Sequence, residues 1–343
     1  MPVIGVAGGS AGIGRTIVEE LLKNKDKHDV KVLARQACTG FLISLERGNN
    51  IENCQLNPEL EQAIGAPFVA VDYTDVKSLT KILEDNEIHT VISTLSFKAA
   101  PGTTIPEVEL VTAAGASGTT KRYVSNNWGV PIRDGEEELA KSIMAFKVNG
   151  LAALKQSANL EYTSFYTGFF SDYWGYPVVK TYMRPASLVL DIQNNAAVIP
   201  GAGNTRVGFA HTSDVAKYVT AAMDLEKWER EYNLVVDNIT LNEFLALAEN
   251  ARGVKFDVTY DSVETLKSGK FTELPAQSKS GLFGTAAGDA IRKHLAASLL
   301  TLDSGRFDFD DGVRGRDAFP EIKPMTVKDI LEEAWGRRFE KER

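Results

Sequence analysis

The sequence predicts an α/β protein in which a doubly wound parallel sheet precedes a smaller C-terminal lobe. Three observations support this fold class. A glycine-rich segment at residues 8–14 lies between an apolar run at residues 3–7 and an amphipathic segment that begins at Thr16. Short apolar runs then alternate with helical segments as far as Tyr166, whereas the sequence after Gly168 is aromatic-rich and loses this alternation.

The glycine-rich segment directly follows the first predicted strand. Gly8, Gly12 and Gly14 remove side chains where the turn must be tight, where a pyrophosphate must approach backbone N–H groups, and where helix packs on strand. The helix that begins there offers unpaired N–H groups and a partial positive charge to phosphates. This order of elements predicts a Rossmann fold that binds a dinucleotide. The residues of the turn that we expect to contact the cofactor are Gly8, Gly9, Ser10, Ala11, Gly12 and Ile13.

The second predicted strand, residues 30–35, ends at Arg35. An acidic residue at this place would hydrogen-bond the 2′-OH of NAD. Arginine can instead form charge-assisted hydrogen bonds with the 2′-phosphate of NADP. The alternative is a solvated arginine that ends an edge strand. Arg35 therefore favours NADP(H) as the cofactor.

Four further strands continue the alternation. We expect them at residues 68–72, 90–95, 122–125 and 162–166, with helices at about 76–83 and 136–158. Such alternation implies a parallel sheet with right-handed crossovers, whose ligands bind beyond the carboxyl ends of the strands. Residues at these ends should converge on the cofactor. They are Asp72, Thr94, Leu95, Ser96 and Asn126.

The domain boundary falls where the pattern changes. We expect residues 1–167 to form the NADP-binding domain, to which the chain returns at about residues 195–238, and residues 168–343 to form mainly the substrate-binding lobe. Residues 37–66 are polar and irregular, which predicts an insertion near the adenosine end. Residues 266–317 are rich in glycine, serine and charge, which predicts a mobile lid or lobe edge.

Aromatic residues crowd the segment 168–176. They can simply pack into a core, or they can form the wall of an apolar substrate pocket beside the nicotinamide. The residues predicted to contact substrate are Trp128, Phe169, Phe170 and Tyr173.

Composition narrows the class of partner. The 343 residues are 43% hydrophobic and carry a net charge of −8, which argues against nucleic acid as a partner. Two cysteines without CxxC spacing indicate reduced thiols, and the four histidines lack the spacing of metal ligands. No stretch resembles a signal peptide or a membrane span. We therefore expect a cytoplasmic monomer or homodimer that binds a small-molecule substrate and neither metal nor membrane.

Several motifs together resemble one family. They are the turn at 8–14, Arg35, residues 121–129, Lys147, residues 160–163 with 168–170, and residues 199–204 with 211–216. Over residues 2–240 the chain resembles the NmrA-like, isoflavone-reductase-like branch of atypical short-chain dehydrogenases, in the style of its fungal members. The resemblance implies an NADP-binding Rossmann domain and a smaller substrate lobe. The branch includes reductases of plant and fungal aromatic metabolites alongside redox-sensing regulators.

The resemblance also implies a role for Lys147. It aligns, within a residue, with the lysine that the reductases of this branch use near the nicotinamide ribose. There it would anchor the ribose hydroxyls and polarise or protonate the substrate as a catalytic residue. The alternative is a solvated lysine on a surface helix.

Two features depart from related patterns. The usual Ser-Glu-Phe-Gly after the fifth strand is Asn-Asn-Trp-Gly at residues 126–129, so amides replace an acidic side chain. The turn has the GxxxGxG spacing that is more usual in the YxxxK dehydrogenases. However, the YxxxK pairs Tyr73/Lys77 and Tyr176/Lys180 do not lie on the helix after the fifth strand, and Pro177 opposes a helix at the second pair. We interpret both pairs as coincidental.

The predicted function is an NADPH-dependent reductase of an apolar, aromatic or conjugated secondary metabolite. One alternative is a catalytically silent NADP(H) sensor that binds a protein partner. Another is a redox-neutral enzyme that retains its cofactor. Lys147 and the aromatic segment favour the reductase, whereas the missing tyrosine and the amides at 126 and 127 leave the sensor as an alternative.

Overall fold

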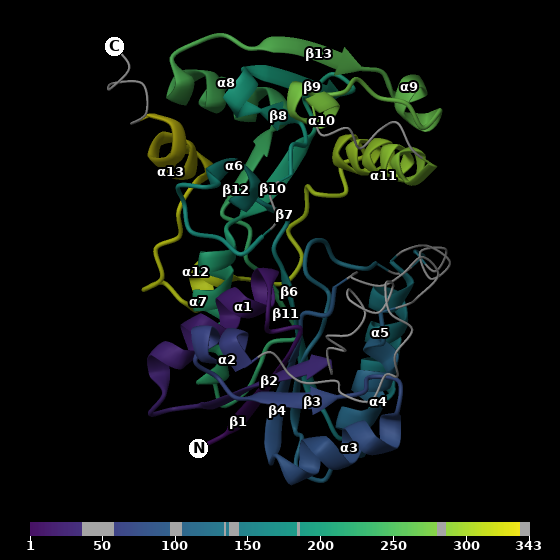
Figure 1. Ribbon diagram of the computed structural model, residues 1–343, viewed down its shortest axis with the longest axis vertical. Coiled ribbons are helices and arrows are strands. Elements are labelled where there is room, and N and C mark those ends of the chain that lie inside the picture. The colour runs from purple at the N-terminus through teal and green to yellow at the C-terminus, as the bar shows by residue number, and fades with distance from the viewer. Residues whose placement is uncertain are drawn as a thin grey trace, which may run out of the picture. The chain divides into compact units, whose positions relative to one another are not determined.

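A computed structural model describes residues 1–35, 58–96, 105–133, 135–136, 144–183, 186–279 and 286–336. The chain forms two compact units (Figure 1). Unit 1 comprises Met1–Phe165 and Ala216–Tyr232, and unit 2 comprises Tyr166–Val215 and Asn233–Arg343. The assignment of cofactor binding to one unit and substrate binding to the other stays a prediction.

Unit 1 is built on a parallel sheet. Its strands are β1 (Val3–Ala7), β2 (Asp29–Arg35), β3 (Phe68–Val71), β4 (Ile88–Ser93), β5 (Arg122–Val124) and β6 (Glu161–Tyr166), and β11 (Glu231–Asn233) lies beside β6. The order β6-β5-β4-β1-β2-β3 reverses direction at β1, which pairs in parallel with both β2 and β4. Such a reversal is the switch point at which doubly wound sheets bind ligands. The predicted Rossmann fold is confirmed.

Helices cover this sheet. They are α1 (Gly12–Leu21), followed by a 3₁₀ turn (Leu22–Asn24), α2 (Pro58–Ile64), α3 (Val76–Asp85), α4 (Glu107–Ala116) and α5 (Ala145–Gln156). Helices α3, α4 and α5 pack one against the next, and α1 packs against α2 (Figure 1). Helix α3 shows why these segments are helical: Asp75 caps its first turn by accepting from Ser78 N at 3.0 Å, and Leu79 and Leu83 bury one face.

Two local predictions in unit 1 need correction. The helix expected at 136–158 begins at Ala145 (α5), Glu136 lies outside any helix, and residues 137–143 are outside the described residues. The irregular stretch expected at 37–66 ends in a helix, α2. Residues 36–57, including both cysteines, lie outside the described part, so the role of this stretch stays open.

Unit 2 contains two small sheets. Strands β7 (Phe169–Phe170), β10 (Arg206–Ala210) and β12 (Asp237–Thr240) form one, and β8 (Leu190–Asp191), β9 (Ala196–Pro200) and β13 (Asp257–Asp261) form the other. Strand β14 covers Val313–Arg314. The helices are α6 (Asp172–Gly175), α8 (Leu241–Arg252), α9 (Val263–Lys267), α10 (Pro275–Lys279), α11 (Ala286–Asp303), α12 (Gly315–Ala318) and α13 (Val327–Leu331), with 3₁₀ and π turns at Ile192–Asn194 and Glu332–Gly336. Helix α7 (Thr212–Met223) begins in unit 2 and ends in unit 1.

The stretch 266–317, for which we expected a mobile lid or lobe edge, contains a long helix that packs into the core along one face. Helix α11 contributes Ala296, Leu299 and Leu302 to the core of unit 2, each at most 2% exposed. Their spacing of three residues places them along one face of a helix. No helix in the described part of the chain has the length and apolarity to cross a membrane.

Candidate functional site

The glycine turn leaves no room for a side chain at Gly8 or Gly14. Gly8 and Gly12 have φ angles of +81° and +53°, which favour glycine. A Cβ on Gly8 would lie 2.6 Å from Thr94 O, and one on Gly14 would lie 2.3 Å from Thr94 Oγ1. Thr94 is itself fixed, because its Oγ1 donates to Ala7 O at 2.7 Å. At its glycines the turn therefore presents bare backbone at the switch point of the sheet.

Helix α1 starts in this turn without a competing cap. Its N-cap residue, Ala11, makes no side-chain capping hydrogen bond, and the first turn of the helix contains no acidic residue. The first N–H groups of a helix then remain available to an anion, which the helix dipole also favours. The bare backbone and the uncapped helix start together fit the pyrophosphate of a dinucleotide.

Two predicted residues lie at the ends of neighbouring strands. Arg35 ends β2, the strand that pairs with β1, and its side chain is exposed. Asp72 follows β3, and its carboxylate accepts from Thr74 N at 2.8 Å and from Thr74 Oγ1 at 2.7 Å. These hydrogen bonds lower the pKa of Asp72. Arg35 and Asp72 thus lie at the edge where we expect the cofactor, and their roles there stay predictions.

The ends of β4 and β5 are joined by hydrogen bonds. Asn126 Nδ2 donates to Leu95 O at 2.8 Å, and Trp128 Nε1 donates to Ser93 O at 2.9 Å. The Trp128 ring is 7% exposed and stacks on Phe165 at 6.0 Å between centroids. A substrate contact by Trp128 stays a prediction. Ser96 follows Leu95 and is exposed.

Asn127 marks the departure from the usual motif. It is 1% exposed, and among the described residues neither atom of its side-chain amide has a hydrogen-bond partner. An amide buried in this way costs free energy unless a further group satisfies it.

Lys147 lies in the first turn of α5, and its Nζ donates to Trp128 O. The Nζ is also 6.0 Å from the centroid of the Phe146 ring. The lysine is half-buried and directed to the loop after β5, unlike Lys155 on the same helix, which is exposed. This position is compatible with the predicted role beside the nicotinamide, which stays a prediction.

Sequence reasoning missed Glu107, the first residue of α4. Its carboxylate is 2% exposed and accepts hydrogen bonds from Ser93 Oγ at 2.6 Å, Tyr123 OH at 2.9 Å and Asn126 N at 3.3 Å. Burial raises the pKa of Glu107, and burial beside Glu107 raises that of Tyr123. An acidic residue in a first helical turn is ordinary, so the sequence held no signal of this burial.

The other predicted substrate residues belong to unit 2. Phe169 packs against Tyr173, Trp174 and Phe307, each at 5.7 Å between ring centroids. Phe170 follows it in β7 and pairs with Ala210. Phe169 therefore takes part in core packing, which is one of the two roles predicted for the aromatic segment 168–176.

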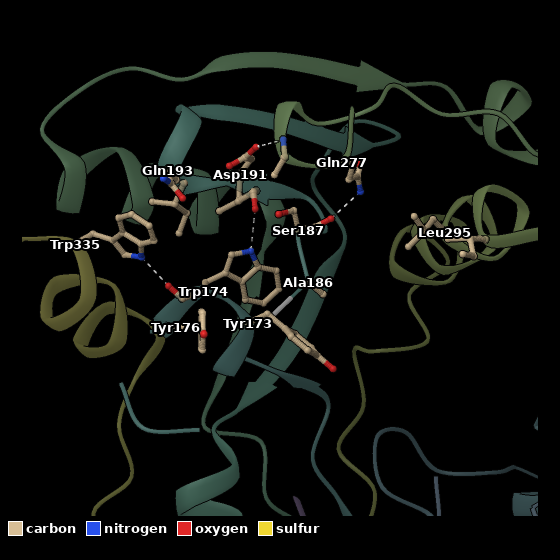
Figure 2. A pocket seen from close by; sticks show the side chains of 14 residues that line it. Tyr173, Trp174, Tyr176, Ala186, Ser187, Asp191, Gln193, Gln277, Leu295 and Trp335 are labelled. Atoms are coloured by element: carbon tan, nitrogen blue, oxygen red, sulfur yellow. Dashed lines mark hydrogen bonds between the residues drawn. The ribbon is translucent and has the colours of Figure 1, made fainter. Parts of the chain in front are cut away.

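A cavity of about 510 Å³ lies within unit 2 (Figure 2). Its aromatic and aliphatic lining consists of Tyr173, Trp174, Tyr176, Trp335, Ala186, Leu190, Ile192, Ala276, Ile291 and Leu295. Phe169, Phe170 and Trp128 are not among its lining residues, whereas Tyr173 is. Burial, reinforced by Asp172, raises the pKa of Tyr173 to about 12, so its hydroxyl remains a donor near neutral pH.

Three donor groups of this cavity are bound within the protein. Trp174 Nε1 donates to Leu190 O at 3.2 Å, and Trp335 Nε1 donates to Trp174 O at 2.6 Å (Figure 2). Gln277 Nε2 donates to Ser187 O at 2.7 Å. These bonds leave ring faces and aliphatic carbons to contact a guest, beside the polar lining residues Tyr173, Asp191 and Gln193.

Comparison with known proteins decides the family. No family model matches the chain. The oxidoreductase BOA1 of Botryotinia fuckeliana is 30% identical over 253 residues, which cover 74% of this chain and 77% of that protein. The isoflavone reductase homolog IRL of Zea mays is 27% identical, over 79% of this chain and 82% of that protein. The chain belongs to the isoflavone-reductase-like family of oxidoreductases.

Solved structures related to this family share the fold. The complex of leucoanthocyanidin reductase with NADPH from Vitis vinifera matches with a TM-score of 0.65 at 18% identity, over 96% of this chain and 98% of that one. The likeness covers both units of the isoflavone-reductase-like chain.

Proposed function

We propose that the chain is an NADPH-dependent reductase of an apolar, aromatic or conjugated small molecule. The observation that carries this proposal is the bare turn at Gly8–Gly14, at the switch point of the sheet and one strand from Arg35. The leucoanthocyanidin reductase of similar fold binds NADPH, which supports the choice of cofactor.

Different residues of unit 1 would bind different parts of the cofactor. The turn from Gly8 to Ile13 would bind the pyrophosphate through backbone N–H groups, and Arg35 the 2′-phosphate. Asp72 would contact the adenosine side of the cofactor. The ends of β4 and β5 would contact its nicotinamide side through Thr94–Ser96 and Asn126. NADPH, when bound, supplies hydride to the substrate.

Lys147 would provide the proton. Its Nζ is held at Trp128 O, at the end of β5. From there the ammonium can hydrogen-bond the ribose hydroxyls and the substrate oxygen, and can donate a proton to that oxygen as the substrate is reduced. The bond to Trp128 O restricts the rotamers of a long side chain, which favours a single orientation of the acid.

The cavity of unit 2 supports the substrate class. Its indole N–H groups are bound to backbone carbonyls, so a guest meets aromatic and aliphatic surface. Such a lining favours a flat apolar molecule with few hydrogen-bonding groups. The Tyr173 hydroxyl can orient one oxygen of that molecule.

The deciding experiment is NADPH oxidation, followed at 340 nm, with a panel of aromatic and conjugated carbonyl compounds and ethers. Lys147→Ala should lower turnover by about 100-fold, the usual effect of losing a general acid. The affinity for NADPH should change much less, because phosphate contacts dominate it. Lys155→Ala is the matched control, since Lys155 is exposed on the same helix.

Equal rates for wild type and Lys147→Ala would reject the lysine as catalytic. Tight NADPH binding without oxidation of any compound would instead support the sensor. A sensor should also change its affinity for a protein partner when NADPH is added.

A further inference from the structure

Glu107 connects three elements that carry predicted cofactor residues. Its three donors come from β4 (Ser93), β5 (Tyr123) and the loop after β5 (Asn126). Helix α5, which carries Lys147, contacts it from a further side. We propose that Glu107 is a positioning residue that holds the ends of β4 and β5 and the start of α5 in the arrangement that binds the cofactor. This inference rests on the proposed function.

The first step concerns the strand ends. Ser93 is the last residue of β4, directly before the predicted contacts Thr94–Ser96. Its hydroxyl donates to Glu107 Oε2 at 2.6 Å, and its carbonyl accepts from Trp128 Nε1 at 2.9 Å. Asn126 is held from both sides, because its N–H donates to Glu107 and its Nδ2 donates to Leu95 O. One buried carboxyl therefore fixes the separation of two strand ends.

The second step concerns Lys147. Three hydrogen bonds connect Glu107 to Lys147: Ser93 Oγ donates to Glu107, Trp128 Nε1 donates to Ser93 O, and Lys147 Nζ donates to Trp128 O. Within Ser93 and Trp128 the connection passes through the covalent structure of the residue. The position of the ammonium thus depends on a residue that does not touch it.

The third step concerns packing. Gly150 lies one helical turn after Lys147, and a Cβ built on it would lie 2.5 Å from Glu107 Cγ. Helix α5 therefore rests directly on the Glu107 side chain, and a shorter side chain would leave a void beneath the helix. It would also leave the three donors without their acceptor in a buried place.

The experiment compares Glu107→Gln with Glu107→Ala. Glutamine keeps the shape of the side chain, its Oε1 can accept from Tyr123 and Asn126, and its Nε2 can donate to Ser93 Oγ. Alanine keeps none of these. Glu109→Ala, a partly exposed acid on the same helix, is the control for the loss of charge.

The experiment has two readouts, amide hydrogen exchange and the Kd for NADPH. The first does not depend on enzymatic activity. In the cofactor-free protein, Glu107→Ala should increase amide hydrogen exchange in peptides that cover residues 93–96, 126–130 and 145–150. The Kd for NADPH should rise about 10-fold, as expected when buried donors lose their acceptor. Glu107→Gln should remain within about threefold of wild type in Kd and should retain wild-type exchange.

Once a substrate is known, Glu107→Ala should lower kcat more than it raises KM, because misplacing Lys147 affects the reacting arrangement. Folded Glu107→Ala with wild-type exchange and wild-type Kd would overturn the proposal. Glu107→Gln that behaves like Glu107→Ala would also overturn it, since acceptor geometry would then not matter.

Ser93→Ala covers the case in which Glu107→Ala does not fold. It removes one donor only and should raise the Kd by about threefold, with increased exchange at 126–130. Wild-type behaviour of a folded Ser93→Ala would count against the proposal. If the wild type fails to bind NADPH, the proposed function fails, whereas the exchange experiment still tests Glu107.

Discussion

The polar site of unit 1 and the cavity of unit 2 use hydrogen bonds in opposite ways. In unit 1 the bonds join strand ends, as between Asn126 Nδ2 and Leu95 O, while the N–H groups at the start of α1 have no side-chain cap. In unit 2 the bonds bind the indole N–H groups of the cavity to backbone carbonyls. Unit 1 therefore suits a charged ligand, and unit 2 an apolar one.

The two units also differ in their buried carboxyls. Glu107 bonds groups that adjoin predicted cofactor contacts. Asp172, fully buried in unit 2, accepts from Thr212 N at 2.9 Å and from Thr181 Oγ1 at 2.5 Å, with His211 Nε2 at 3.5 Å. It joins α6 to the start of α7. Asp172 therefore joins two helix starts within unit 2, whereas we propose that Glu107 holds groups that bind the cofactor.

The largest effect is expected from Trp174→Ala in unit 2. The Trp174 side chain is 4% exposed, and its ring lies 4.7 Å from that of Phe244 and 5.7 Å from that of Phe169. Its removal should lower the free energy of unfolding by about 3–5 kcal/mol, measured by urea denaturation. Trp174→Phe should cost clearly less. If NADPH binding depends on unit 1 alone, the folded Trp174→Ala protein should bind NADPH with wild-type affinity. Weakened NADPH binding would show that the two units do not bind separate ligands in this way.

The next effect is expected from Gly14→Ala in unit 1. The added Cβ would meet Thr94 Oγ1 at 2.3 Å and Gly8 O at 2.5 Å, so the turn must open. The affinity for NADPH should fall about 100-fold, which is roughly 2.7 kcal/mol, by titration calorimetry. Gly118→Ala is the control, because the nearest atom there, Glu84 Oε1, is 3.6 Å away. A folded Gly14→Ala protein with wild-type affinity would show that the turn does not bind the cofactor.

A smaller effect is expected from Arg35→Ala. Wild type should bind NADPH more tightly than NADH. The substitution should narrow this difference by about 1.5 kcal/mol, the lower end for a charge-assisted hydrogen bond, because Arg35 is exposed. Arg35→Lys should retain part of the preference, since it keeps the charge without the fork of donors. Equal affinities of the wild type for the two cofactors would contradict the assignment.

The sequence was informative where function depends on neighbours along the chain. The glycine turn, Arg35 and Asp72 each adjoin a strand, so recognising the strand was enough to place them at the same edge of the sheet. The fold of unit 1 follows from the same strands. Their contacts with NADPH stay predictions.

The sequence was uninformative where a position depends on distant partners. Glu107 meets donors that lie 14, 16 and 19 residues away, and its burial requires Gly150 on another helix. The bond between Trp335 Nε1 and Trp174 O joins residues 161 positions apart. No local pattern encodes either contact. In α11, by contrast, the spacing of Ala296, Leu299 and Leu302 held a helical signal that the glycine and serine content obscured.

The smallest effect at neutral pH is expected from Tyr173→Phe. Among the described residues no hydrogen bond to the Tyr173 hydroxyl is present, so its loss should change the free energy of unfolding by less than about 0.5 kcal/mol at pH 7. The affinity for an apolar substrate should fall if this hydroxyl orients it, and NADPH binding should not change.

The stability of Tyr173→Phe should differ from that of wild type at high pH. Burial and Asp172 raise the pKa of Tyr173 to about 12, above the ordinary value of 10 for tyrosine. Between these values the folded protein keeps a proton that the unfolded chain has lost, so wild type loses stability as pH rises from 10 towards 12. Tyr173→Phe has no hydroxyl to ionise, so its stability lacks this pH dependence. Urea denaturation at pH 9 and pH 11 measures this difference. Between these two pH values wild type should lose more stability than the variant. An equal loss in both would place the hydroxyl in water, outside the apolar lining that distinguishes unit 2 from unit 1.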